Sequence, residues 1–317
     1  MAGGIARSRD YELALDRTGR ILRLLDRSLG APIASDEPFL VFAEATAAGP
    51  ITSDRSGLAF AMASRIESIA ANGPLLRIQV ALGDATGAPK GMMTLDLPGS
   101  GKRLDVTLAI PRAAVTPGSR GLLLFRTSEE IEDVIVERSL GEARGRDLPP
   151  MLMRGGFTLV GPSTRTTIAS RDAAVVLPSI PAVLLYDDAG RRIGRGEGDL
   201  IFRFSVTSSS VMDRDFTAYP FFRSVEVPLC AFDVSTARRS AGDPLPPELS
   251  AIEAMPDAVE LIARRSGPGP SSLTLLVRNM TGRTIKQRIV FPPQGSYLSF
   301  PMDRGDLVTL DVDPTTR

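Results

Sequence analysis

Apolar residues alternate with polar or small residues along much of this chain, and this two-residue period limits the folds open to it. The alternation is clear at residues 76–82 and 104–110, and it returns at 200–206 and 273–277. Successive side chains of a β-strand point to opposite faces of the sheet, so such a period builds half-buried strands. The sequence therefore predicts an all-β protein with only minor helix.

A short turn pattern recurs between the alternating runs. Asx-x-x-Gly begins at Asp16, Asp84, Asp187 and Asn279. An Asx side chain can accept a hydrogen bond from the backbone two residues on, and glycine tolerates the left-handed conformation that closes the loop. The pattern predicts β-hairpins, and its repetition predicts a sandwich plan that is used more than once.

The first copy of this turn leaves two interpretations of the N-terminus. Residues 11–29 can be drawn as an amphipathic helix, or residues 11–15 can pair with 20–25 as a hairpin. Glycine in the middle of a helix costs about 1 kcal/mol. Because Gly19 would occupy such a position and the other copies favour a turn, we expect the hairpin.

Length and linker composition predict two domains. A chain of 317 residues is longer than one hydrophobic core usually serves. Residues 141–154 combine glycines, prolines and mixed charges, as exposed linkers do. We expect two β-sandwich domains of immunoglobulin-like character, at 1–145 and 146–317.

Helix is expected in few places. Residues 246–255 begin with prolines and end before Pro256, and Thr127 to Glu130 form a capping-box pattern that starts a short helix from Ser128. Residues 58–71 fit a strand and a helix equally well, since their apolar positions match both periods.

Histidine is absent, and Cys230 is the single cysteine. These two facts exclude Ser-His-Asp and Cys-His catalysis, an intrachain disulfide and the usual zinc sites. Gly99 to Lys102 resembles a phosphate-binding loop, but the spacing needs glycine at Asp96 and Ser or Thr at Arg103. We therefore expect no cofactor, no metal and no catalytic residue, and hence no enzyme.

Charge and hydropathy limit the partners. Acidic and basic residues balance at 37 each, whereas nucleic-acid binders usually carry a basic surplus. Only three of the basic residues are lysines, at positions 90, 102 and 286, which we attribute to a GC-rich genome. The longest uncharged apolar stretch, 173–186, is too short to cross a bilayer and contains two prolines. We expect no nucleic acid, no transmembrane segment, and membrane contact only at the periphery or through a partner.

The N-terminus shows no apolar segment of the kind found in signal peptides. A cytoplasmic or membrane-peripheral location is expected on that ground. A periplasmic location is expected if a leader has been removed.

One cluster of aromatic residues stands out near position 220, with arginines on both sides. Aromatic side chains usually enter a core, but aromatic and arginine side chains also dominate binding hot spots. We therefore name the cluster as the candidate partner-binding site: Arg214, Phe216, Tyr219, Phe221, Phe222 and Arg223.

Three functions fit these observations. The leading hypothesis is a non-catalytic binding or scaffolding subunit of a larger bacterial assembly with other protein subunits as partners, for example a peripheral accessory subunit of a respiratory or photosynthetic membrane complex. An exported ligand- or glycan-binding β-sandwich module is the alternative. A carboxylate-dependent hydrolase is the third, since a glycosidase needs only two suitably placed acids.

Overall fold

A computed structural model shows that the chain divides into two compact units, Met1–Glu226 and Val227–Arg317. Both units are built from antiparallel sheets, so the predicted all-β, sandwich-like class is confirmed. The structure describes residues 4–35, 37–46, 58–138, 141–188, 198–213, 218–226, 253–255, 259–265, 273–279, 284–291, 296–303 and 306–312.

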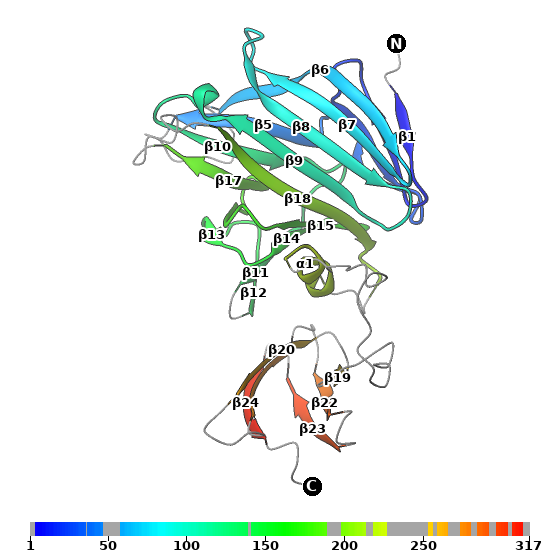
Figure 1. Ribbon diagram of the computed structural model, residues 1–317, viewed down its shortest axis with the longest axis vertical. Coiled ribbons are helices and arrows are strands. Elements are labelled where there is room, and N and C mark those ends of the chain that lie inside the picture. Colours follow the sequence, from blue (N-terminus) through cyan, green and yellow to red (C-terminus); the bar gives the residue numbers. More distant parts are fainter. Residues whose placement is uncertain are drawn as a thin grey trace, which may run out of the picture. The chain divides into compact units, whose positions relative to one another are not determined.

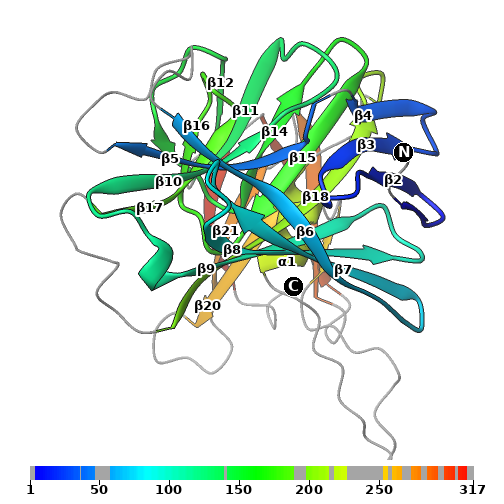
Figure 2. The ribbon, with the colours of Figure 1, turned by 90° about the horizontal axis from the view of Figure 1, so that it is seen from above.

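The first unit begins with a small sheet in the order β1-β2-β3-β4. Figure 2 shows β2, β3 and β4 grouped on one side of this unit. In β2 the alternate residues Tyr11, Leu13 and Leu15 are buried. β2 pairs with β3, so the expected N-terminal hairpin is confirmed. The strands are β1 (Ile5–Arg7), β2 (Tyr11–Leu15), β3 (Ile21–Asp26) and β4 (Ala31–Ser35).

A long antiparallel sheet forms the rest of the first unit, and several of its strands run side by side in Figure 1. Its order is β12 (Gly141–Arg144), β11 (Asp133–Arg138), β14 (Gly156–Val160), β15 (Thr164–Ser170), β18 (Asp199–Ser210), β9 (Leu104–Pro111), β8 (Pro89–Pro98), β7 (Leu75–Gly83), β6 (Leu58–Asn72), β5 (Leu40–Thr46), β10 (Ser119–Phe125), β17 (Ala182–Asp187), β16 (Val175–Leu177) and β13 (Met151–Leu152). A short 3-10 helix, η1 (Arg112–Ala114), precedes β10.

Strands from distant parts of this sheet share one core. The ring of Phe125 in β10 lies 5.6 Å from that of Phe157 in β14 and 6.0 Å from that of Phe204 in β18, measured between centroids. Both pairs are edge-to-face, an arrangement that aromatic rings prefer. The sheet therefore folds back on itself, and the alternating apolar residues found in the sequence fill the space between its parts.

The repeated turn has the expected construction at its first two copies. The Asp16 carboxylate accepts hydrogen bonds from the backbone N–H of Thr18 at 2.8 Å and of Arg20 at 3.0 Å. At the second copy the Asp84 carboxylate accepts the equivalent bonds, and the closing glycine has a positive φ at both copies. At the copies that start at Asp187 and Asn279, the glycine lies outside the described residues.

The second unit holds two small sheets, β19 (Glu253–Met255), β22 (Ile285–Phe291) and β23 (Ser296–Met302) in one, and β20 (Val259–Arg265), β21 (Leu273–Asn279) and β24 (Leu307–Val312) in the other. Buried residues from both sheets, including Val277 and Ile289, make one apolar cluster. This unit is a small sandwich with its own core.

The predicted domain boundary lies inside the first unit. Residues 141–154, expected to be a linker, contain β12 and β13, which pair with β11 and β16. The division at 226/227 differs because β9 pairs with β18 and β11 with β14, which ties residues before 145 to residues after it.

Helix occurs in other places than the sequence predicts. Residues 58–71 belong to β6, and residues 253–255 form β19, while the rest of 246–255 lies outside the described residues. No helix starts at Ser128, because the nearby Glu129 carboxylate instead accepts hydrogen bonds from the backbone of Ser163 and Thr164 in the β14–β15 turn. In the described part of the chain, no helix has the length and apolar character that crossing a membrane requires.

Candidate functional site

The aromatic cluster named from the sequence lies partly in a helix, α1 (Tyr219–Glu226). Arg214 and Phe216 lie outside the described residues, whereas Tyr219, Phe221, Phe222 and Arg223 are in α1. Pro220 occupies the first turn, where its missing N–H is tolerated. The strand expected here is therefore wrong.

α1 packs on β15 through one aromatic residue. Phe222 is 4% exposed and packs with Ala169 and Val225, and Phe221 is half-buried beside it. Phe222 is therefore a core residue rather than an exposed anchor. A partner-binding role for the rest of the cluster stays a prediction.

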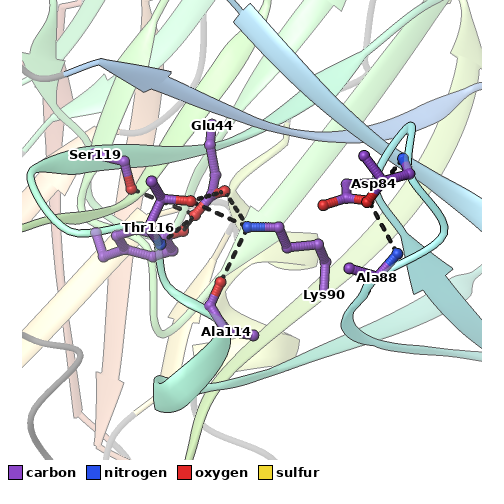
Figure 3. A network of polar contacts seen from close by, with 9 residues as sticks. Glu44, Asp84, Ala88, Lys90, Ala114, Thr116 and Ser119 are labelled. Carbon is purple, nitrogen blue, oxygen red and sulfur yellow. Dashed lines mark hydrogen bonds and ion pairs between the residues drawn. The ribbon is translucent and has the colours of Figure 1, made fainter.

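A cluster of buried polar residues lies where β5, β8, β10 and β17 come together, and Figure 3 shows it around Glu44. Glu44 of β5 is 7% exposed. The Lys90 ammonium of β8 donates to its Oε2 at 2.7 Å. We call this group, with Thr116, Ser119 and Tyr186, the Glu44 cluster.

Both oxygens of Glu44 are fully engaged. Oε1 accepts from the Tyr186 hydroxyl at 2.7 Å, the Thr116 N–H at 3.0 Å and the Ser119 hydroxyl at 3.3 Å. Oε2 accepts from the Thr116 hydroxyl at 2.7 Å in addition to Lys90. Charge-assisted bonds of this kind are the strong ones, and this many donors satisfies the carboxylate.

The sequence makes room for this cluster at one glycine. Gly121 of β10 lies opposite Tyr186 of β17, with a register shift beside it. A Cβ on Gly121 would lie 2.2 Å from the Tyr186 ring. Only glycine lets the ring lie over β10 and its hydroxyl reach Glu44.

The electrostatics keep Glu44 charged. Burial by itself would raise the pKa of this carboxyl group, but the hydrogen bonds from Lys90, Thr116 and Tyr186 outweigh burial and hold its pKa below the ordinary value. Burial and the neighbouring carboxylate raise the pKa of Tyr186, which stays a neutral donor. Glu44 is thus an ionised anchor, and it has no lone pair left for proton transfer.

A second buried ion pair ties the small sheet to the long one. Asp26 at the end of β3 is 0% exposed, and the Lys102 ammonium lies 2.6 Å from its Oδ2. The Ser208 hydroxyl of β18 donates to the same oxygen at 2.6 Å and lies 2.9 Å from the Tyr11 hydroxyl. Lys102, found within a false phosphate-loop match, thus has a structural partner.

These clusters contain two of the chain's three lysines. Sequence reasoning missed both, because it attributed the scarcity of lysine to genome composition alone. The available signal was the position of Lys90 inside an alternating strand, where a charged side chain needs a partner.

A pocket in the first unit adds no acidic chemistry. It is lined mainly by core residues such as Phe42 and Met93, with Arg20 as its charged member and no acidic side chain. Within the described ranges, no group of three or more acidic or cysteine side chains is placed to hold a metal ion.

The fold is similar to that of two solved bacterial proteins. One is an α-mannosidase from Enterococcus faecalis V583, with a TM-score of 0.74 and 13% identity over 97% of this chain and 42% of that one. The other is a protein of glycosyl hydrolase family 38 from Enterococcus faecalis, with a TM-score of 0.73 and 13% identity over 97% of this chain and 43% of that one. The present chain therefore spans less than half of either protein's length.

Sequence comparisons are silent. No protein-family model matches the chain, and no curated protein matches it either. At 13% identity the structural likeness establishes the fold, and function has to be proposed.

Two expectations from the sequence are contradicted by this likeness. The chain was expected to be a non-catalytic binding or scaffolding subunit, and not an enzyme. The fold that matches 97% of it belongs instead to carbohydrate-processing enzymes. The error arose because missing histidine and cysteine chemistry was read as missing function, and because no fold likeness is visible in the sequence.

Proposed function

We propose that this chain is an all-β part of a carbohydrate-processing enzyme and that it binds glycan. The observation that carries the proposal is the likeness to the α-mannosidase structure, which extends over 97% of the chain and includes both units. The glycan-binding module named as an alternative from the sequence is the form of this idea that concerns the chain itself.

We place the bond-breaking chemistry in the portion of such an enzyme that this chain does not match. The chain covers 42% of the α-mannosidase, so most of that protein has no counterpart here. Glu44, the acid examined most closely above, is engaged by donors on both oxygens. In this proposal the Glu44 cluster keeps four strands in register and so provides a rigid frame for glycan contacts.

Binding and hydrolysis of mannosides test the proposal. The purified chain is titrated with α-linked manno-oligosaccharides by calorimetry, with β-linked gluco-oligosaccharides of equal length as control. An aryl α-mannoside is assayed in parallel. We expect saturable binding of the α-linked series. If none of the sugars binds and none is hydrolysed, the proposed function is wrong.

A further inference from the structure

The second unit carries a basic and aromatic patch on one side of its β19-β22-β23 sheet. Along β22, alternate residues from Ile285 to Phe291 are buried, while Lys286 and Arg288 between them are exposed. On β23, Tyr297 and Ser299 are exposed. We call these four exposed residues the Tyr297 face.

The residues of the Tyr297 face are neighbours across one strand pair. Arg288 lies opposite Ser299, and Val290 lies opposite Tyr297. The guanidinium carbon of Arg288 lies 4.1 Å from the centroid of the Tyr297 ring, a cation–π contact. Stacking of this kind holds the ring and the cation in fixed positions.

The ring stays largely open to solvent despite this contact. Tyr297 is 58% exposed, and among the exposed large apolar side chains of the described residues it is the aromatic one. An exposed aromatic ring on a rigid strand pair is unfavourable in water unless something covers it.

Charge and size indicate what covers it. Lys286 is two residues from Arg288 on the same strand, so the two cations are about 7 Å apart along it. Cross-strand neighbours add about 5 Å in the other direction. At the described outward positions of β22 and β23 there is no acidic residue. The patch has the dimensions of one sugar ring with one anionic substituent.

We propose that the Tyr297 face binds a sugar that carries a phosphate. The sugar ring packs against Tyr297, and the phosphate is held by Lys286 and Arg288, since both cations are established phosphate donors. This inference rests on the proposed glycan-binding function and names a ligand class and a place for it.

The scarcity of lysine provides a direct test. Lys90 and Lys102 are 15% and 28% exposed and lie in ion pairs with Glu44 and Asp26, whereas Lys286 is exposed. A mild amine-reactive reagent followed by peptide mass spectrometry therefore reports on Lys286 against two internal references. Mannose 6-phosphate should slow modification of Lys286 and leave the other two lysines unchanged.

Variants of Tyr297 separate a sugar site from a simple cationic patch. Tyr297→Ser should weaken mannose 6-phosphate binding about tenfold, as the loss of an aromatic contact does, while Tyr297→Phe keeps the ring and stays within about threefold of the parent. Met212→Ser is the matched control, because Met212 is 82% exposed in the first unit. It should have no effect.

The arms of the experiment distinguish the sources of the signal. Equal protection of Lys286 by inorganic phosphate and by mannose 6-phosphate would overturn the sugar site in favour of an anion site. Binding of neutral α-mannosides that is unchanged in Tyr297→Ser, with Lys286 unprotected by mannose 6-phosphate, would overturn this inference and leave the proposed function standing. Absence of binding by every sugar would overturn both.

Discussion

At the scale of single residues, the first unit depends on charges that were taken out of water together. Glu44 and Lys90 have side-chain exposures of 8% and 15%, and Asp26 is paired with Lys102 in the same way. Removing one member of a buried pair leaves the other charge uncompensated, which costs far more than the pair contributes in net terms.

Lys90→Met should therefore destabilise the protein by about 3–5 kcal/mol. Urea unfolding measures the change. The matched control is Arg65→Met, since the Arg65–Glu67 pair is exposed at 73% and 31%, and such pairs contribute about 0.2–1 kcal/mol. A double variant, Glu44→Gln with Lys90→Met, should recover part of the loss. Equal costs for the Lys90 and Arg65 variants would contradict the role of burial.

The pKa of Glu44 also predicts how stability depends on pH. Because its folded-state pKa lies below the ordinary value of 4.5, ionised Glu44 stabilises the folded state above that pH, and this stabilisation is lost as the pH falls through the folded-state pKa. Glu44→Gln should lower stability at pH 7 and flatten its decline below about pH 4.5. Thermal melting at a series of pH values measures both, and an unchanged acid limb would exclude this account.

At the scale of elements, hairpin turns show how much a local pattern determines. The turns at Asp16 and Asp84 have the same hydrogen bonds, and their glycines have φ values of +93° and +83°. Their surroundings differ. A Cβ at Gly19 would meet Val80 at 2.7 Å, whereas a Cβ at Gly87 would meet nothing within 4 Å.

This difference separates backbone strain from packing. Gly87→Ala should cost about 1–2 kcal/mol, from the left-handed conformation alone. Gly19→Ala should cost the same amount plus about 1–3 kcal/mol for overpacking against Val80. Chemical denaturation of the two single variants gives both values. A Gly87 variant that is the more damaging of the two would refute the comparison.

Helix α1 is a second element whose role can be measured. Phe222→Ala should destabilise the first unit by about 3–5 kcal/mol, since a large buried ring is removed. Phe221→Ala should cost clearly less, because Phe221 is half-buried. Denaturant unfolding of the two variants decides the order, and similar losses would mean that both rings are core.

At the scale of the whole molecule, the unit boundary predicts which fragments fold. The fragment 1–226 keeps every strand pair of the long sheet and should give a cooperative melting transition by circular dichroism. The fragment 1–145 loses the partners of β9 and β11 and should aggregate or remain unfolded. A cooperative transition in 1–145 would restore the boundary expected from the sequence.

The sequence by itself determined the local features of this protein. Period-two alternation identified the strands at 76–82, 104–110 and 200–206, because side-chain direction in a strand depends only on neighbouring residues. The Asx-x-x-Gly turn identified the hairpin at Asp16 for the same reason, since its bonds close within five residues.

Only the tertiary structure decided the site and the likeness to known enzymes. Glu44 meets Lys90 across 46 residues and Tyr186 across 142, and no periodicity relates positions so far apart. Residues 219–226 became helix because Phe222 packs on Ala169 of a distant strand, which outweighs the local strand pattern. The domain boundary moved to 226/227 because sheet pairing, a long-range property, joined the two halves that composition had separated.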